Sequence, residues 1–287
     1  MALPEPEIVL GGGNVNVGVV RVGDTVRRAM SRSSPAIHRL LLHLESKAFN
    51  GSPRFLGTDD QQREILSYLH GEVGVHPRIW ETDEALFAAA GLLRRYHDAT
   101  KDFLTLESDD WTFSHQDRRR HEVICHNDFA PYNFVFSARI PYAVIDFDLA
   151  GPGPRLRDVA YAAYWMTPLS FSAPEMKPYT EADVANGSRR LIRFCAHYGV
   201  PTNQALLGMV MEVLVDMGDE ERVRTGLGAQ AADRLRLGGH FEHWRREAEA
   251  LRSTEEELRE QLLELSDRGV RDASKDIGQA TPGDRRR

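Results

Sequence analysis

The segment HNDFAPYN (residues 126–133) lies between two apolar stretches that each predict a short β-strand, and the acidic motif VIDFD follows it. Asn and Asp are common in turns, so polar residues in a loop need no special explanation by themselves. Here, however, Asp128, Asn133 and Asp146 all lie at the loop ends of consecutive predicted strands. We therefore expect a fold in which these loops bring the three polar side chains together.

Carboxylate and amide groups in this combination suit phosphoryl transfer from a nucleotide. That reaction needs an oriented acceptor hydroxyl, metal ions that bridge the phosphates, and groups that offset negative charge. One Asp near the hydroxyl can position it and take its proton, while Asn and a second Asp offer the hard oxygen ligands that Mg²⁺ prefers. Asp128, Asn133 and Asp146 supply this set of groups.

The first 70 residues predict a small antiparallel sheet with one inserted helix. Residues 15–22 are rich in β-branched residues, and a Gly-Asp pair then gives a hairpin turn into the next strand, which begins at Thr25. Ser34 and Pro35 are typical of a helix start, and apolar residues with a period of 3.6 follow them. Two more strands are predicted on either side of the turn at 58–61.

From residue 71 onward the pattern changes to long helices, interrupted by the short strands that carry the polar loops. Residues 157–266 are mostly helical in pattern, whereas the end of the chain has almost no apolar residues to bury. We expect an N-terminal nucleotide-binding lobe at 1–70, a catalytic and substrate lobe at 71–266, and a disordered tail at 267–287. A ligand site is expected in the cleft between the two lobes.

Composition narrows the setting of the protein and its partners. The 287 residues carry a net charge of −7, which argues weakly against nucleic acid as a partner, and no apolar run is long enough to span a membrane. The start of the chain lacks a signal-peptide pattern, and there are only two cysteines, with no CxxC motif. We therefore expect a cytoplasmic protein that binds neither nucleic acid nor membrane, and an acidic cleft would favour a cationic substrate.

The segment CHNDFAPYN resembles the catalytic loop of the aminoglycoside phosphotransferase and choline-kinase-like family, relatives of the protein kinases. His126, Asp128 and Asn133 match its H-x-D-x-x-x-x-N pattern, and IDFD resembles the metal-binding segment that follows. The resemblance implies an α+β, protein-kinase-like two-lobed fold, with a small β-rich N-terminal lobe and a larger helical C-terminal lobe. It also implies ATP or GTP as co-substrate, a small-molecule hydroxyl acceptor, Asp128 as the catalytic residue, and Mg²⁺ held by Asn133 and Asp146.

The chain departs from the family pattern in two places that bear on the nucleotide. Asn127 replaces the usual Gly or Arg between His and Asp, and the third strand has no Lys to bind the nucleotide phosphates. We expect Arg28 to take the place of that Lys, because it shares a strand face with Val26; Arg27 is the second choice. The acidic partner on the helix would then be Glu45.

Two further segments are assigned by their position in the resemblance. The glycine-rich stretch GGGNVNVG (11–18) falls where the nucleotide-covering loop should be, although it matches no standard phosphate-binding motif. The segment that joins the lobes is expected to contact the nucleotide base through its backbone, at Ser67, Tyr68 and Leu69.

Other residues leave alternatives open. Asp148 is either a second metal ligand or a loop residue. His126 and Asp158 are expected to hold the catalytic loop through hydrogen bonds, and the acidic run at 212–220 is either a solvated helix end or part of a site for a cationic acceptor. The alternatives to a small-molecule kinase are a nucleotide-binding immunity or scaffold protein without transfer activity, which the missing Lys favours, and a metal-dependent hydrolase.

Overall fold

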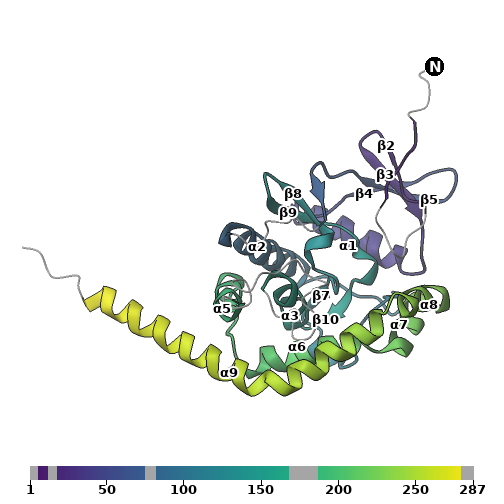
Figure 1. The fold of residues 1–287 in the computed structure, drawn as a ribbon. Coiled ribbons are helices and arrows are strands. Elements are labelled where there is room, and N and C mark those ends of the chain that lie inside the picture. The colour runs from purple at the N-terminus through teal and green to yellow at the C-terminus, as the bar shows by residue number, and fades with distance from the viewer. Residues whose placement is uncertain (1–5, 12–17, 75–81, 168–186, 279–287) are drawn as a thin grey trace, which may run out of the picture.

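The computed structural model describes residues 6–11, 18–74, 82–167 and 187–278. It has two lobes, a strand-rich one formed by the N-terminal part of the chain and a helical one formed by the rest (Figure 1). The expected α+β, two-lobed architecture is confirmed. The glycine-rich stretch at 12–17 lies outside the described residues, so its expected role stays a prediction.

The N-terminal lobe is a five-stranded sheet in the order β1-β2-β3-β5-β4. One helix, α1 (Ser34–Ser46), follows the third strand, as predicted. Val22 pairs with Thr25, so the predicted hairpin turns at Gly23 and Asp24. The strands are β1 (Ile8–Val9), β2 (Val20–Val22), β3 (Thr25–Ala29), β4 (Phe55–Thr58) and β5 (Arg63–Ser67).

The register between β3 and β5 decides which side chains point toward the other lobe. These two strands are antiparallel, with Val26 opposite Leu66 and Arg28 opposite Glu64. Because side chains alternate along a strand, all four lie on one face of the sheet. Leu66 is buried and Val26 packs against the core, so this is the inward face.

The C-terminal lobe carries its polar loops on two small sheets. One has the order β6-β8-β9 and the other pairs β10 with β7. The strands are β6 (Glu72–Val73), β7 (Val123–Cys125), β8 (Phe134–Ser137), β9 (Ile140–Val144) and β10 (Gly151–Gly153). The helices among the described residues are α2 (Asp83–Thr100), α3 (Arg155–Met166), α5 (Gly187–Tyr198), α6 (Gln204–Met217), α7 (Glu220–Leu227), α8 (Ala229–Leu237) and α9 (His240–Gly278).

A single large apolar core joins the two lobes. It contains the inner stripe of α1, including Leu40 and Leu44, together with Leu86 and Leu93 of α2, all of them fully buried. Helix α2 also contacts β7, β9, α3 and α5, so it is the central element against which the polar loops are fixed. The amphipathic pattern of both helices follows from this packing.

The end of the chain differs from the prediction. Helix α9 continues to Gly278, so residues 267–278 are helical where the sequence predicts a disordered tail. The yellow end of α9 projects away from the body of the protein (Figure 1). A segment with few apolar residues can still form a helix, because helix propensity is a local property of its residues.

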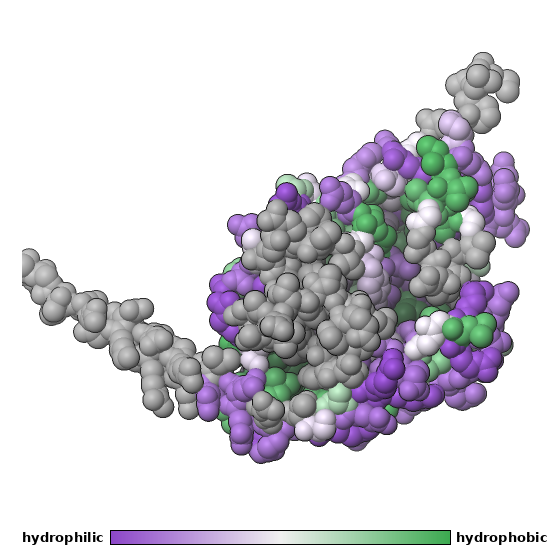
Figure 2. All heavy atoms as spheres, viewed as in Figure 1, coloured by the Kyte–Doolittle hydropathy of each residue, from purple (hydrophilic) through white to green (hydrophobic). Residues whose placement is uncertain are grey.

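The described residues on the face seen in Figure 2 are largely hydrophilic. In Figure 2 most of the coloured atoms are purple, with a green patch over the N-terminal strands, where Ile8 and Val9 are exposed. No helix within the described ranges is both long enough and apolar enough to cross a membrane.

Candidate active site

The loop after β7 places Asp128 at the base of the site. Pro131–Asn133 forms a 3₁₀ turn that leads directly into β8. The side-chain amide of Asn133 reaches back, and its Nδ2 donates to Asp128 Oδ2 at 2.8 Å and to the Asp128 carbonyl at 3.0 Å. The Tyr132 hydroxyl donates to Asp128 Oδ1 and lies 2.7 Å from the Tyr161 hydroxyl. Both carboxylate oxygens are therefore held in a defined orientation.

The surroundings of Asp128 make it a stronger base than an ordinary aspartate. Burial raises the pKa of Asp128, and the hydrogen bonds from Tyr132 and Asn133 offset only part of that rise. A carboxylate with a raised pKa accepts a proton more readily, provided that it is still ionised at the working pH.

Asp158, near the start of α3, holds the loop that carries Asp128 through hydrogen bonds to its backbone. Its carboxylate accepts the His126 backbone N–H at 2.6 Å, the Asn127 backbone N–H at 2.8 Å and His97 Nε2–H at 3.0 Å. Burial acts to raise the pKa of Asp158, but the hydrogen bond and charge of His97 and the contact with His126 lower it below its ordinary value. The predicted role of Asp158 as a buried acceptor for the loop is confirmed.

His126 also has the structural role that the sequence predicts. Its ring lies 3.1 Å from the Ile145 carbonyl through Nε2, and Nδ1 accepts the Asp128 backbone N–H at 3.3 Å. These two bonds assign the proton to Nε2 and make the ring a spacer between the two polar loops. Burial lowers the pKa of His126, so the neutral form is favoured.

Asn127 stands at a backbone conformation that few residues tolerate. Its φ is 64°, in the left-handed region where Gly is favoured and Asn is among the better-tolerated alternatives. Asn127 Nδ2 donates to the Leu149 carbonyl at 2.8 Å, and its Oδ1 accepts Arg157 Nε–H at 2.9 Å. Arg157 is held in turn by Asp216 at 2.6 Å. Asn127, where the family pattern has Gly or Arg, thus links the catalytic loop to the loop after β9 through its side chain.

Asp146 and Asp148 lie on the loop after β9. The Ile145 backbone N–H donates to the Asn133 carbonyl at 2.9 Å, which places Asp146 next to the catalytic loop. Burial and the nearby Asp148 carboxylate raise the pKa of Asp146 to about 7, although Arg28 acts to lower it. Negative charge is therefore crowded at this point, and binding of a cation would relieve it.

Arg28 extends from β3 toward the loop after β9 and contacts both acidic residues. Its Nη2 lies 2.5 Å from Asp148 Oδ1, and its Nη1 lies 3.1 Å from Asp148 Oδ2 and 3.4 Å from Asp146 Oδ1. Arg27, on the opposite face of the strand, instead lies 3.6 Å from Asp59. The strand phase inferred from Val26 is therefore the one observed.

The prediction that Glu45 of α1 is the acidic partner of Arg28 is wrong. Glu45 is exposed and lies 3.5 Å from Arg54, because it sits on the outer side of α1. The carboxylate that contacts Arg28 is Glu64 of β5, whose Oε1 accepts Arg28 Nε–H at 2.5 Å.

The segment after β5 has some of its backbone donors already in use. The Ser67 N–H donates to the Arg54 carbonyl, and the Tyr68 N–H donates to the Asp24 carbonyl at 2.8 Å. The Arg21 guanidinium stacks over the Tyr68 ring at 3.8 Å. The expected contacts of Ser67, Tyr68 and Leu69 with a nucleotide base stay a prediction.

The donor set around Asp146 fits Mg²⁺ by its chemistry. Asn133 offers an amide oxygen, and Asp146 and Asp148 offer carboxylates at a point where negative charge is only partly balanced by Arg28. Among the described residues no group of three or more His, Cys, Asp or Glu side chains is arranged as a preformed metal site. A bound ion would therefore draw on Asn133 and on phosphate oxygens as well as on the carboxylates.

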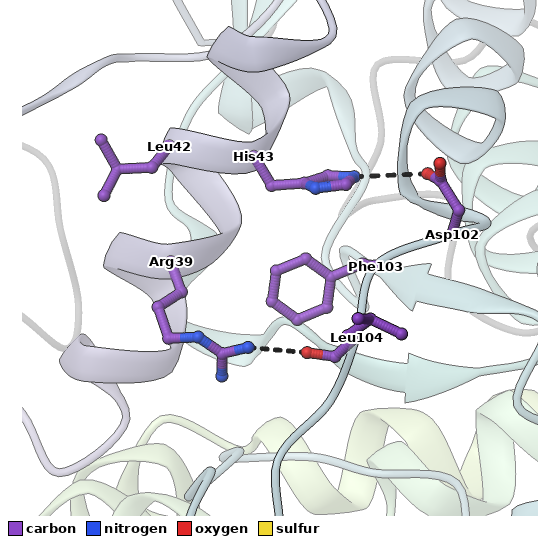
Figure 3. Close-up of a pocket in the computed structure, with 6 residues that line it drawn as sticks. All are labelled: Arg39, Leu42, His43, Asp102, Phe103 and Leu104. Carbon is purple, nitrogen blue, oxygen red and sulfur yellow. Dashed lines mark hydrogen bonds and ion pairs between the residues drawn. The ribbon is translucent and has the colours of Figure 1, made fainter.

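A surface hollow of about 310 Å³ lies elsewhere, between α1 and the segment after α2 (Figure 3). It is lined by Arg39, Leu42, His43, Asp102, Phe103 and Leu104. Its polar groups are engaged within the protein, as Arg39 donates to the Leu104 carbonyl and His43 lies 2.9 Å from the Ala99 carbonyl. It shares no residue with the Asp128 cluster and has no evident part in its chemistry.

Sequence reasoning missed three residues of the site: Glu64, Tyr132 and Tyr161. Tyr132 lies inside the HNDFAPYN segment, so the sequence shows that it is near Asp128. The sequence does not show that its hydroxyl donates a hydrogen bond to the carboxylate. Glu64 could have been found by strand alternation, since it is two residues from the buried Leu66. Tyr161 is placed by the packing of α3, which no local pattern reports.

Comparison with known proteins agrees with this geometry. Residues 76–194 match the model of the phosphotransferase enzyme family. The resemblance to the aminoglycoside phosphotransferase and choline-kinase-like family is therefore confirmed.

One curated relative and two solved structures illustrate the likeness. The trifolitoxin immunity protein of Rhizobium leguminosarum bv. trifolii is 38% identical over 150 residues, which cover 51% of this chain and only 56% of that protein. A putative aminoglycoside phosphotransferase from Ralstonia eutropha (15% identity) and a choline kinase from Streptococcus pneumoniae (12% identity) each have a TM-score of 0.54. In both cases the match covers 86% of this chain and 94% of the other. At these identities the two structures show only the fold of this chain, which is the expected protein-kinase-like fold.

Proposed function

We propose that the protein is an ATP- or GTP-dependent phosphotransferase that moves the γ-phosphoryl group to a hydroxyl of a small molecule. The observation that carries this proposal is the convergence of Asp128, Asn133 and Asp146 on adjoining loops, with Arg28 facing them from the other lobe. A protein that only binds nucleotide has no need of a carboxylate held in place by two donors at the acceptor position.

In the proposed reaction Asp128 orients the acceptor hydroxyl and takes its proton. Tyr132 and Asn133 fix the carboxylate, so that little reorganisation is needed when the proton moves. Asn133 and Asp146 would hold Mg²⁺, which when bound offsets the negative charge of the nucleotide phosphates. Arg28 steadies the same phosphates, for which its planar fork of donors is well suited.

The acceptor is proposed to be a small molecule, either aminoglycoside-like or another cationic compound. The acidic run at 212–220 does not support a free acidic lining, because Glu212 lies 2.9 Å from His115 and 3.3 Å from Arg120. Support for a cationic acceptor comes instead from the negative charge of Asp128, which is felt by the nearby Asp146. We keep the cytoplasm as the proposed compartment, where a nucleotide is available and the buried free thiols of Cys125 and Cys195 would remain reduced.

The direct test is incubation of purified protein with γ-labelled ATP or GTP, Mg²⁺ and a panel of aminoglycosides, amino alcohols and sugars. Label should appear in at least one acceptor, and none should appear when Mg²⁺ is omitted. Nucleotide binding with no transfer to any acceptor would support the second candidate below, and hydrolysis of a substrate without nucleotide would support the hydrolase alternative.

The second candidate is a nucleotide-binding immunity protein that transfers nothing. Two observations favour it. Arg28 occupies the face of Asp146 and Asp148 that a metal ion would use, and the 38% identical relative is named as an immunity protein. An immunity function and phosphoryl transfer are compatible if the transferred group inactivates a toxic compound.

The roles of the two arginines on β3 can be separated. Arg28→Ala should weaken nucleotide binding by about tenfold or more, as expected for loss of a charge-assisted contact, whereas Arg27→Ala should change it by less than twofold. Isothermal titration with ATP would measure both. A larger effect of Arg27→Ala would mean that the inward face of β3 does not meet the nucleotide.

Asp146→Asn should reduce nucleotide affinity by about tenfold in the presence of Mg²⁺, because one negative ligand is removed from the ion. Without Mg²⁺ the affinity should stay the same or rise, since the variant repels phosphate less. Titrations with and without Mg²⁺ would decide. Equal affinities of variant and parent in Mg²⁺ would remove Asp146 from the metal site.

A further inference from the structure

Glu64 is a buried carboxylate that contacts a nitrogen-bearing side chain from each of two elements. Its side chain is 1% exposed, and it lies in the middle of the inward face of β5. Oε1 accepts Arg28 Nε–H at 2.5 Å, and Oε2 lies 2.6 Å from Nε2 of His38 on α1. Since a carboxylate can only accept, the His38 ring must present its proton at Nε2.

The surrounding structure fixes this arrangement. Arg28 and Glu64 are directly opposite in the β3–β5 pairing, so their contact follows from strand register. The His38 ring stacks on Phe55 of β4 with ring centres 3.8 Å apart and planes at 13°. His38 therefore cannot turn away from Glu64 without losing that contact. An unpaired carboxylate at this depth would be costly, and both of its oxygens are satisfied.

The contacts divide the Arg28 guanidinium into two sides. The Nε side is bonded to Glu64, while both terminal nitrogens face Asp146 and Asp148. Burial by itself would lower the pKa of Arg28, but Asp148, Glu64 and Asp146 together raise it above its ordinary value. When phosphate replaces the Asp148 contact, the Nε side can stay in place, because Glu64 belongs to the sheet and not to the metal loop.

We infer that Glu64 is the residue that positions Arg28 for the nucleotide phosphates, with His38 holding Glu64 from the side of α1. This inference rests on the proposed function. In this chain the anchor for the phosphate-binding cation is thus on the neighbouring strand, and the helix takes part only through an imidazole. Glu45, the acid on α1 that the kinase pattern points to, has no contact with Arg28.

The test compares nucleotide affinity in Glu64→Leu, Glu64→Gln and the matched control Glu45→Gln. Glu64→Leu removes both acceptors and should weaken ATP binding by about tenfold, the effect of one charge-assisted hydrogen bond. Glu64→Gln keeps an acceptor oxygen for Arg28 but loses the charge, and it should weaken ATP binding by about twofold to fivefold. Glu45→Gln loses the same charge on the outer side of α1 and should bind ATP like the parent. Circular dichroism of each variant establishes whether it is folded. If Glu64→Leu does not fold, the comparison of Glu64→Gln with Glu45→Gln carries the test, and equal ATP affinities of these two variants would overturn the inference.

A double-mutant cycle separates positioning from a general structural role. In an Arg28→Leu background, a further Glu64→Leu change should alter ATP affinity by less than twofold, because Glu64 then has no guanidinium to orient. If Glu64→Leu weakens binding equally in both backgrounds, or if it binds ATP like the parent, the inference is overturned.

A second readout keeps this inference distinct from the proposed function. If the parent binds no nucleotide, the proposed function fails, and the arginine Nε–H signals in a ¹H–¹⁵N NMR spectrum still test the positioning. Arg28 should give a signal protected from exchange that is lost in Glu64→Leu and retained in Glu45→Gln. Persistence of that signal in Glu64→Leu would show that Arg28 is held without Glu64.

Discussion

Asp128→Asn should lower turnover by ~10²- to 10⁴-fold, the range that a positioned general base contributes. The substitution keeps the size of the side chain but removes its ability to take a proton from the acceptor hydroxyl. Affinity for Mg²⁺-nucleotide should stay within about threefold of the parent, because the metal would be held by Asn133 and Asp146 and not by Asp128. Initial rates with labelled nucleotide and binding titrations on the same preparation would separate the two quantities.

Asp102→Asn is a suitable control for this experiment. Asp102 is half-exposed in the separate hollow of Figure 3 and pairs with Lys47 at 2.5 Å, so its loss should leave both rate and affinity unchanged. Full turnover in Asp128→Asn would exclude Asp128 as the base, and loss of Mg²⁺-nucleotide affinity in parallel with rate would place it in the metal site instead.

Asp158→Ala should destabilise the protein by about 3–5 kcal/mol, the usual result of leaving the partners of a buried charge unsatisfied. Three donors lose their acceptor at once: two backbone N–H groups of the catalytic loop and the ring of His97. Urea unfolding followed by circular dichroism would measure the change. Asp98→Ala, which removes a partly exposed acid on α2 paired with Arg94, should cost less than about 1 kcal/mol.

The same residue predicts a pH dependence of stability. The folded pKa of Asp158 lies below its ordinary value of 3.8, so the folded state binds the proton more weakly than the unfolded state does. Its contribution to stability is therefore present above about pH 4 and is lost as pH falls through the lower folded pKa. The stability difference between the parent and Asp158→Ala should shrink in that acidic range, and a difference that stays constant with pH would contradict this reading.

Local patterns predicted the parts of the site that depend on strand geometry. Alternation along β3 put Arg28 on the same face as Val26, and the register with β5 confirms it. Asp158 was predicted from the family resemblance of its segment, and its burial beside the loop explains why it needs donors nearby. The convergence of Asp128 and Asn133 followed from their position between two strands.

The parts that failed depend on how elements pack. The choice of Glu45 required knowledge of which side of α1 faces the sheet, and the helix in fact presents His38 there. The extension of α9 to Gly278 could not be read from burial, because that segment is helical without being docked. Periodicity gives the apolar stripe of a helix but not the polar residue at its edge that meets a neighbouring strand.

Asn127 has a consequence for which replacements this loop can accept during evolution. Glycine would adopt the φ of 64° without strain but would release the Leu149 carbonyl and Arg157, so the two loops would lose their side-chain bridge. Aspartate would tolerate the backbone but would face the Leu149 carbonyl with an acceptor instead of a donor. A search pattern that demands Gly or Arg between His and Asp will pass over chains built like this one.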